Sequence, residues 1–346
     1  MVRCTCRVGG LLLAALAIVL AASCASKETG GGESASPFAA LSGPYFGQPP
    51  PGMTPEMFAR GAVSTGMQEL NAVFFPGARE FCYSIDGGAM RFVLLLTREE
   101  DGCWTEPEVT LFTQEYTGVD AWATKDGNRL YFCSDRPRPG EERRSDWDIW
   151  YVDRMPTGWS EPVNVGPPVN SEADEFYPSL ADDGTMYFQS SRVGGMGGRE
   201  LWRSEWVDGR YTEPENLGPP INSAGFEGDP CIAGDESFII FSAANRDDTI
   251  GMGDLYICFR TDDGGWSEAV HMGEEINSRA HENCPIFSPD GRYFFFTSRK
   301  TPDESPETRI TYESLKNRLT CPENGQGDIY WVDARVIDQF RPESLD

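Results

Sequence analysis

Histidine is scarce in this sequence, and the cysteine spacings that bind metals are missing. Only two histidines occur, His271 and His281, and beyond residue 24 no two cysteines are separated by two residues. Structural zinc sites need closely spaced Cys and His ligands. We therefore expect no zinc site, no other metal ligand set and no cofactor.

The motifs of the common catalytic sites are also missing. The sequence has no Gly-x-Ser-x-Gly nucleophile elbow, no phosphate-binding loop and no His-Glu-x-x-His pair. The repeats described below use up the rest of the chain, so no stretch is left for a separate hydrolase domain. The expectation is a protein without catalytic residues.

Basic residues are few compared with acidic ones. The chain has 29 Lys and Arg against 55 Asp and Glu, which gives a formal net charge of −26. A surface of this kind repels the phosphates of nucleic acid and also anionic lipid headgroups. We expect no nucleic acid partner, and contact with a membrane only through a lipid anchor.

The first residues have the pattern of a secretion signal. Arg3 and Arg7 precede an unbroken apolar run over residues 11–20, and small residues follow up to Ser23. Ten apolar residues are too few to cross a hydrocarbon layer of about 30 Å. Residues 1–23 are therefore predicted to be a signal peptide.

The small residues before Cys24 resemble the lipobox of bacterial lipoproteins. The resemblance implies that Cys24 is lipidated and becomes the new N-terminus. Ala21 stands where that family usually has Leu, so cleavage by the ordinary signal peptidase stays open. Residues 25–36 are polar and rich in Gly and Ser, which favours a flexible tether over residues 24–44. The implied location is the cell envelope, with the lipid in the outer membrane and the protein facing the periplasm or the cell surface, because Ala25 follows the cysteine.

Two motifs recur along the rest of the chain, each at spacings of 52 to 55 residues and in the same register. The first is Trp-x-Glu-Pro or a close variant, and the second contains an Asn-Ser pair. The first begins at Trp104, Trp159, Tyr211 and Trp266, and the second ends at Ser171, Ser223 and Ser278. A fixed period of this length is typical of repeat architectures.

Each repeat unit is predicted to form four short strands. The second strand is an aromatic and β-branched run over residues 129–134, 185–190, 237–242 and 292–297. Asp-Gly pairs just before three of these runs supply tight hairpin turns. Third strands are predicted to begin at Asp148, Glu200, Asp254 and Asp328. The Trp-x-Glu-Pro segment is predicted to form the fourth, where an outer edge tolerates proline.

Sheets this small, with no helical pattern between them, predict an all-β propeller of antiparallel four-stranded blades over residues 45–346. Five blades are expected, starting near residues 67, 119, 173, 227 and 281, and six remain the alternative. The last unit has only three strands, so residues 57–65 are predicted to close the ring beside residues 328–332. Residues 45–55, rich in Pro and Gly, are expected to lie across the surface.

The run Phe-Ser-Pro-Asp-Gly at residues 287–291, followed by an aromatic strand and Thr-Ser-Arg, resembles the WD-like propeller repeat of exported bacterial proteins such as TolB. The resemblance covers about residues 45–342. It implies the propeller fold and a binding or scaffolding role in the cell envelope. It does not imply a ligand, since this fold serves many unrelated functions.

Charged residues recur at two places in the repeat. Four glutamates stand at the predicted start of an innermost strand: Glu69, Glu175, Glu227 and Glu282. Four arginines end the second strands: Arg136, Arg192, Arg246 and Arg299. Strand one begins and strand two ends at the same face of an up-and-down blade. Both sets are therefore predicted to lie on one face around the central channel, as the candidate binding face.

Two interpretations of these charged residues stay open. Each Glu could pair with an Arg and link the blades, or both sets could form a polar funnel for a cation, a sugar or a peptide terminus. Residues 300–327 are predicted to overhang this face, with a short helix over residues 310–319. The Asn-Ser pairs are predicted to cap turns, and Trp104, Trp159 and Trp266 to pack between blades.

The function that follows is a non-catalytic binding or scaffold protein of the cell envelope, with an envelope protein or a glycan as its partner. The alternative is a propeller glycoside hydrolase or another carbohydrate-active enzyme. A hydrolase of this kind would use two of the four glutamates as acid and base across the channel.

Overall fold

The structure is a computed structural model that describes residues 36–346 apart from 89–90, 143–145, 197, 303–309 and 343–346. The predicted signal peptide, Cys24 and the tether up to residue 35 lie outside the described residues. Within the described part of the chain, no helix has the length and apolar character needed to span a membrane.

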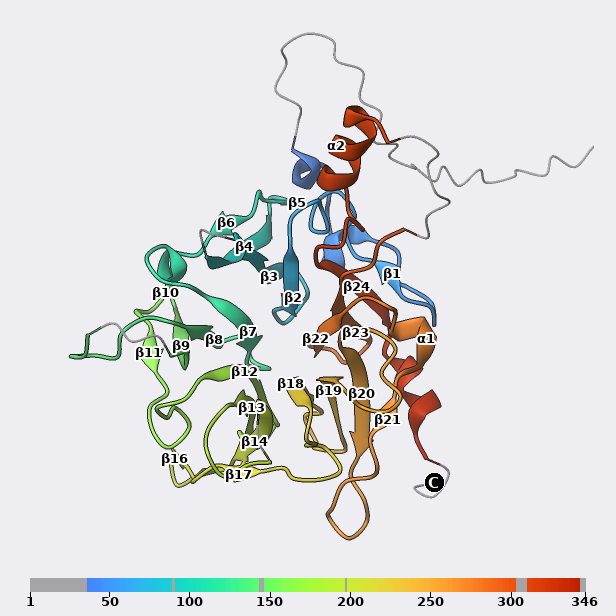
Figure 1. Cartoon of the computed structure of the whole chain (residues 1–346). Helices are drawn as coiled ribbons and strands as arrows, with labels where there is room; N and C mark the ends of the chain where they lie inside the picture. Colours follow the sequence, from blue (N-terminus) through green and yellow to red (C-terminus); the bar gives the residue numbers. More distant parts are fainter. Residues whose placement is uncertain (1–35, 89–90, 143–145, 197, 303–309, 343–346) are drawn as a thin grey trace, which may run out of the picture. The chain divides into compact units, whose positions relative to one another are not determined.

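Five antiparallel sheets surround a common centre, which confirms the predicted five-bladed propeller (Figure 1). The innermost strands are β2 (Glu69–Phe74), β7 (Val119–Ala123), β12 (Glu175–Leu180), β18 (Phe226–Ile232) and β22 (Glu282–Phe287). The second strands are β3 (Glu80–Asp86), β8 (Arg129–Ser134), β13 (Met186–Ser190), β19 (Phe238–Ala244) and β23 (Tyr293–Ser298). The third are β4 (Phe92–Glu100), β9 (Asp148–Met155), β14 (Glu200–Ser204), β20 (Asp254–Phe259) and β24 (Asp328–Asp333).

The outermost strands are only two residues long. They are β6 (Glu108–Val109), β11 (Val163–Asn164), β17 (Glu215–Asn216), β21 (Val270–His271) and β1 (Glu56–Met57). The remaining strands are β5 (Cys103–Trp104), β10 (Gly158–Trp159), β15 (Trp206–Val207) and β16 (Arg210–Tyr211). The helices are η1 (Pro37–Ala40), η2 (Pro44–Gly47), η3 (Leu111–Thr113), α1 (Gly273–Ile276), α2 (Tyr312–Thr320) and η4 (Ala334–Phe340).

The placement of the fourth strand was wrong in the sequence analysis. Trp159 in the Trp-x-Glu-Pro segment extends the third strand as a hairpin, since β10 pairs with the end of β9. The fourth strand follows it, with Val163 opposite Tyr151 and Asn164 opposite Trp150. The proline therefore lies in the connection between the hairpin and the outer strand.

Side chains alternate between two blade interfaces. In β8, Leu130 and Phe132 pack into the core shared with blade 1, whereas Tyr131 and Cys133 pack into the core shared with blade 3. Successive residues of a strand point to opposite faces, so the second strand has no solvent-exposed face. This explains why these runs are continuously apolar, and why most cysteines act as small buried side chains. The buried ones are Cys82, Cys133, Cys231, Cys258 and Cys284.

The N-terminal segment closes the ring, as predicted. Glu56 of β1 lies opposite Trp331 of β24, Met57 lies opposite Tyr330, and the Phe58 amide donates a 2.8 Å hydrogen bond to the Ile329 carbonyl. Phe58 is fully buried, and its ring meets those of Phe74, Phe295 and Trp331 at centroid distances of 5.1–5.6 Å.

Residues 45–55 were expected to lie across the surface, and their first part does not. Tyr45 and Phe46 are buried, and Phe46 stacks on Trp104 with the ring centroids 3.9 Å apart. Phe38, within the range predicted as tether, is also buried and lies 6.0 Å from the Phe46 ring. Phe46 therefore packs against blade 1, and Tyr45 packs against blade 1 and against Tyr293 and Trp331 of blade 5.

Replacing Phe58 with Ala should destabilise the propeller by about 3–5 kcal/mol, because the change leaves a cavity where the closing segment meets blades 1 and 5. Denaturant unfolding of both forms measures the difference. The control is Leu111→Ala, at a residue that is 84% exposed, and its expected effect is below about 0.5 kcal/mol. A loss below about 1 kcal/mol for Phe58→Ala would contradict this role.

Candidate functional site

The predicted glutamates are buried at the start of the innermost strands. Glu175 accepts hydrogen bonds from the Ser171 amide at 2.9 Å and the Ser171 hydroxyl at 2.6 Å. The side chain of Asn170, the residue before Ser171, exchanges two hydrogen bonds with the backbone of Ile149 in the previous blade, at 2.8 and 2.9 Å. The Asn-Ser pair therefore caps a turn, as predicted, and connects each blade to the next.

Two of the predicted arginines pair with these glutamates. Arg192 contacts Glu175 at 3.0 Å, and Arg246 contacts Glu227 at 3.1 Å. Each arginine also donates to a backbone carbonyl of the linker before its blade, that of Val169 or Ile221. Burial raises the pKa of Glu175 and lowers the pKa of Arg192, as desolvation does for a buried ion pair. Both pairs are internal to their blades.

The other members of the two sets are arranged differently. Arg136 has no glutamate partner in its repeat, because Gly118 takes that place, and its guanidinium lies 5.2 Å from the Trp150 ring centre. Glu282 accepts hydrogen bonds from Ser278 and Ser298. Glu282 and Arg299 are both among the described residues, and they form no ion pair with each other.

Blade 1 has no arginine at the end of its second strand, and Glu69 is fully buried. It accepts a hydrogen bond from the Thr65 hydroxyl. Burial raises the pKa of Glu69 to about 8, and the nearby Asp328 adds to this. Burial likewise raises the pKa of Asp328 to about 7. This part of the ring therefore holds two carboxyl groups that resist ionisation.

The channel contains a ring of five residues that the sequence analysis missed. In every blade, the residue two positions after the repeated Glu, or after Gly118 in blade 2, has a positive φ between 49° and 58°. This residue lies beside a break in the register between the first and second strands. The five residues are Asn71, Asp120, Tyr177, Asp229 and Cys284. A positive φ is uncommon for Tyr and Cys, and such strained positions tend to cluster at functional sites.

Tyr177 closes the channel at this level. Its hydroxyl accepts a 3.1 Å hydrogen bond from the Asn71 amide and donates a 3.0 Å bond to the Pro285 carbonyl. The side chain thus reaches from blade 3 to blades 1 and 5, and it is 1% exposed. The channel is therefore divided into two ends.

Asp120 and Asp229 of the same ring are close enough to influence each other. Burial, followed by repulsion from Asp229, raises the pKa of Asp120 well above its ordinary value. Burial raises the pKa of Asp229 in spite of a 3.1 Å hydrogen bond from the Cys284 amide. Among the described residues, neither carboxyl group forms an ion pair.

Aromatic rings surround the channel end at which the innermost strands begin. Trp147 lies 5.2 Å from Phe176 and 6.4 Å from Phe92, measured between ring centroids. The Arg199 guanidinium lies 4.7 Å from the Phe176 ring centre. Phe92 and Phe176 also pack against the buried Leu70 and Tyr177, so these rings lie directly above the closure.

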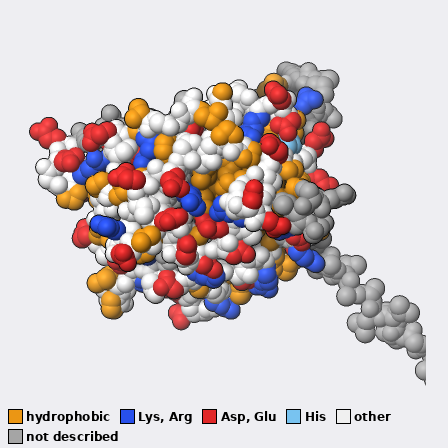
Figure 2. Space-filling model, turned by 90° about the horizontal axis from the view of Figure 1, so that it is seen from below, with side chains coloured by type: hydrophobic (Ala, Val, Ile, Leu, Met, Phe, Trp, Pro, Cys, Tyr) orange, Lys and Arg blue, Asp and Glu red, His pale blue; other side chains and the backbone are white. Residues whose placement is uncertain are grey.

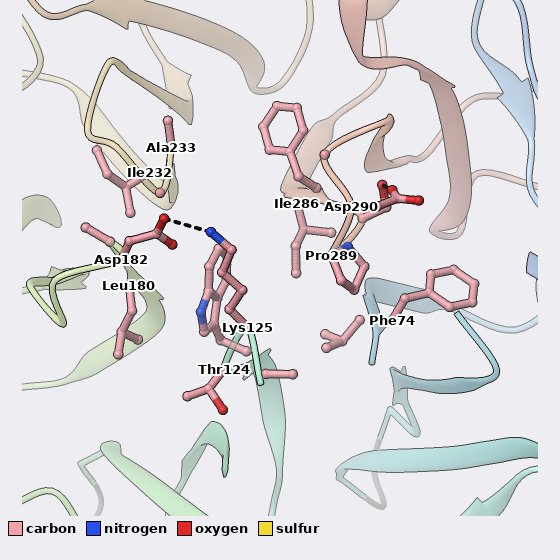
Figure 3. Close-up of a pocket in the computed structure, with 18 of the residues that line it drawn as sticks. Phe74, Thr124, Lys125, Leu180, Asp182, Ile232, Ala233, Ile286, Pro289 and Asp290 are labelled. Atoms are coloured by element: carbon pink, nitrogen blue, oxygen red, sulfur yellow. Dashed lines mark hydrogen bonds and ion pairs between the residues drawn. The ribbon is translucent and has the colours of Figure 1, made fainter. Parts of the chain in front are cut away.

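A funnel opens at the opposite end, where the innermost strands finish. Its volume is about 1230 Å³. The walls are mainly apolar, and side chains from the ends of the innermost strands and the turns after them surround the hollow (Figure 3). Among the apolar lining residues are Phe74, Trp122, Leu180, Ile232, Ile286 and Pro289. Lys125 and Asp182 form a 2.7 Å ion pair at the rim.

The long segment between β23 and β24 contains α2, which confirms the predicted helix. In Figure 1 this helix lies outside the ring of innermost strands rather than over its centre. The end of the segment contacts blade 1, where Asn324 donates a 3.0 Å hydrogen bond to the Gly66 carbonyl. Part of the segment, residues 303–309, lies outside the described residues.

The raised pKa of Glu69 predicts a loss of stability with increasing pH. A carboxyl group with a higher pKa in the folded state binds its proton more tightly there, so the stabilisation is lost as the pH rises from about 4.5 to about 8. Glu69→Gln should therefore be more stable than the original protein at pH 8.5, by on the order of 3 kcal/mol, and should show a weaker pH dependence.

Denaturant unfolding at pH 5 and pH 8.5 measures this effect. The matched control is Glu227→Gln, which removes the partner of Arg246 and should be less stable at both pH values. Equal stability of the Glu69→Gln variant and the original protein at pH 8.5 would contradict the assignment.

Comparisons with known proteins agree on the fold. No family model matches the sequence, and no curated protein matches it. Among solved structures, a glycoside hydrolase is 9% identical, with a TM-score of 0.51 over 86% of this chain and 93% of that one. A putative TolB from Agrobacterium tumefaciens is 16% identical, with a TM-score of 0.45 over 77% and 90%. TolB from Acinetobacter baumannii is 13% identical, with a TM-score of 0.44 over 77% and 54%. At these identities the likeness concerns the fold alone.

Proposed function

We propose that the protein is a non-catalytic binding module of the cell envelope, and that its funnel holds an apolar segment of a protein partner. The observation that carries the proposal is the funnel at the end of the channel where the innermost strands finish. At about 1230 Å³ it exceeds the cavities of roughly 300–1,000 Å³ that typically hold small molecules. A hollow of this size fits several side chains of a polypeptide.

The chemistry of the walls favours a protein over a glycan. Sugars need many hydrogen-bonding groups, whereas the funnel presents carbon atoms from half-buried residues such as Trp122, Leu180 and Pro289. Two of the basic groups at the rim pair with acidic ones, Lys125 with Asp182 and Arg129 with Asp153. On the side shown in Figure 2, acidic side chains are spread among basic ones instead of gathering in one patch. Burial of apolar surface is therefore the main attraction available.

The geometry of the repeated glutamates gives less support to a glycoside hydrolase. An acid and base pair has to flank a glycosidic bond across an accessible cleft. Glu175 and Glu227 are fully buried and ion-paired with arginines of their own blades. A carboxylate held in this way has no free face for a substrate. Catalysis by this set would require the blades to rearrange.

Selection of a random peptide display library on the protein tests the binding site. The selected peptides should be rich in large apolar residues, and fluorescence polarisation should show at least about tenfold weaker binding to Leu180→Asp. This change removes an apolar wall contact worth about 1.5–3 kcal/mol and introduces a charge. The control Val193→Asp, at a residue 97% exposed beyond the other end of β13, should bind normally.

Two outcomes would contradict the proposed site. One is equal binding of the selected peptides to the Leu180→Asp variant. The other is the selection of no peptide together with binding of glycans that depends on Trp147 and Phe176, which would place recognition at the opposite end of the channel.

The envelope location rests on the lipobox resemblance at Cys24, and we propose that a lipid on this residue anchors the protein. The variant Cys24→Ser, with residues 1–23 exchanged for a signal peptide that the ordinary signal peptidase removes, should move from the membrane fraction to the soluble fraction of cells, because the acidic surface gives no other attraction to headgroups. Fractionation and immunoblotting measure the distribution. Retention of the variant on membranes would contradict the anchor.

A further inference from the structure

The ring of five channel residues contains more hydrogen-bond acceptors than donors. Its donors are already used. The Asn71 side-chain nitrogen donates to Tyr177, and the Tyr177 hydroxyl donates to Pro285. Asp120 accepts a hydrogen bond from the Tyr177 backbone. Asp229 accepts hydrogen bonds from the Cys284 backbone amide and from the Asn283 side chain. None of these groups is left to offset the acceptors that remain.

The remaining acceptors are oxygen atoms. The side-chain oxygen of Asn71 is buried and has no hydrogen-bond partner, and Asn71 is 0% exposed. The side-chain oxygen of Asn283, the neighbour of Cys284, is also buried without a partner. Asp120 and Asp229 add two carboxyl groups without an ion pair among the described residues. Buried acceptors normally have a partner, so this arrangement lacks a cation or a donor.

We propose that the channel ring binds a divalent hard cation of the Ca²⁺ class, through the carboxylates of Asp120 and Asp229 and the amide oxygens of Asn71 and Asn283. These residues come from blades 2, 4, 1 and 5, so one cation would contact four blades at the centre of the ring. Tyr177 closes the channel beside the site. Asp120 and Asp229 as whole residues are half-buried rather than fully buried.

The ligand types select this class of cation. Calcium takes six to eight oxygen ligands from carboxylates, amides and water, in flexible geometry. Zinc prefers Cys and His ligands, and the ring contains no histidine. The described residues hold no group of three or more His, Cys, Asp or Glu side chains placed for any metal, so the amide oxygens have to supply part of the ligand set. Two carboxylates with two amides and added water fit calcium.

Two arginines lie near the proposed site, and among the described residues neither forms an ion pair with Asp120 or Asp229. Arg199 lies 3.5 Å from Asp174 and stacks on Phe176, so its charge is partly matched. The charge of Arg299 also acts on Asp229, without an ion pair between them among the described residues. The affinity should therefore be modest, in the range of about 10⁻⁴–10⁻³ M that is common for extracellular calcium modules.

Thermal unfolding of the full chain in 0.15 M NaCl tests the site. With 5 mM CaCl₂ in place of EDTA, the melting temperature should rise by about 3–5 °C. Asp229→Asn and Asp120→Asn should remove this rise while melting in EDTA at or above the temperature of the original protein, since each relieves the repulsion between the two carboxylates. The control Asp263→Asn, in the exposed turn after β20, should keep the full rise.

Terbium luminescence gives a second readout. Tb³⁺ excited through nearby aromatic rings should show a component that saturates at one ion per chain and is displaced by Ca²⁺, and both aspartate variants should lack it. The proposal is overturned by an unchanged melting temperature in Ca²⁺, or by an equal rise in the original protein and both variants. It is also overturned by an equal rise with MgCl₂ in all forms, which would indicate charge screening, or by stabilisation with methylamine and not with Ca²⁺, which would indicate an ammonium site.

Discussion

The structure depends on the fact that each blade has two apolar faces and cannot bury either of them alone. In β8, Leu130 and Phe132 face one neighbour while Tyr131 and Cys133 face the other. A row of such sheets would leave apolar surface exposed at both ends, and a closed ring leaves none. This constraint explains why residues from both ends of the chain build blade 5, with β1 beside β24.

The same constraint determines what the recurring polar residues do. Backbone N–H and C=O groups next to the linkers between blades need hydrogen-bond partners. The side chain of Asn170 provides both partners for Ile149. Ser171 and Glu175 then hold the start of the next blade, and Arg192 neutralises that glutamate. Where a repeat lacks the arginine, as at Glu69, the Thr65 hydroxyl donates to the glutamate and burial raises its pKa to about 8. The repeat is therefore a unit of stability, and the features that break it are the ones that suggest function.

The sequence predicted the repeat well, because strand patterns and turn residues are local signals. The blade boundaries, the closing segment, the helix α2 and the turn-capping role of Asn170 were all predictable. The two-residue outer strands were not, because a pair such as Val163–Asn164 carries no periodicity. The burial of Tyr45 and Phe46 was also hidden, since Pro and Gly around them are typical of surface segments.

The candidate sites were harder to predict for a physical reason. Leu180 and Ile232 have the same character as core residues, so sequence could not show that they line a funnel. The channel ring is recognisable only when the third residues of the innermost strands are aligned, and these differ in type: Asn71, Asp120, Tyr177, Asp229 and Cys284. That variation was itself a signal of a possible functional site, because residue types that differ from blade to blade are not required to build the repeated blade.

No blade of this propeller should be stable without its neighbours, and native-state hydrogen exchange followed by mass spectrometry measures whether this is so. The amides of β2, β7, β12, β18 and β22 should exchange through one common opening with the same free energy, because opening any blade exposes the faces of two others. A blade whose innermost strand opens at a clearly lower free energy than the rest would contradict it.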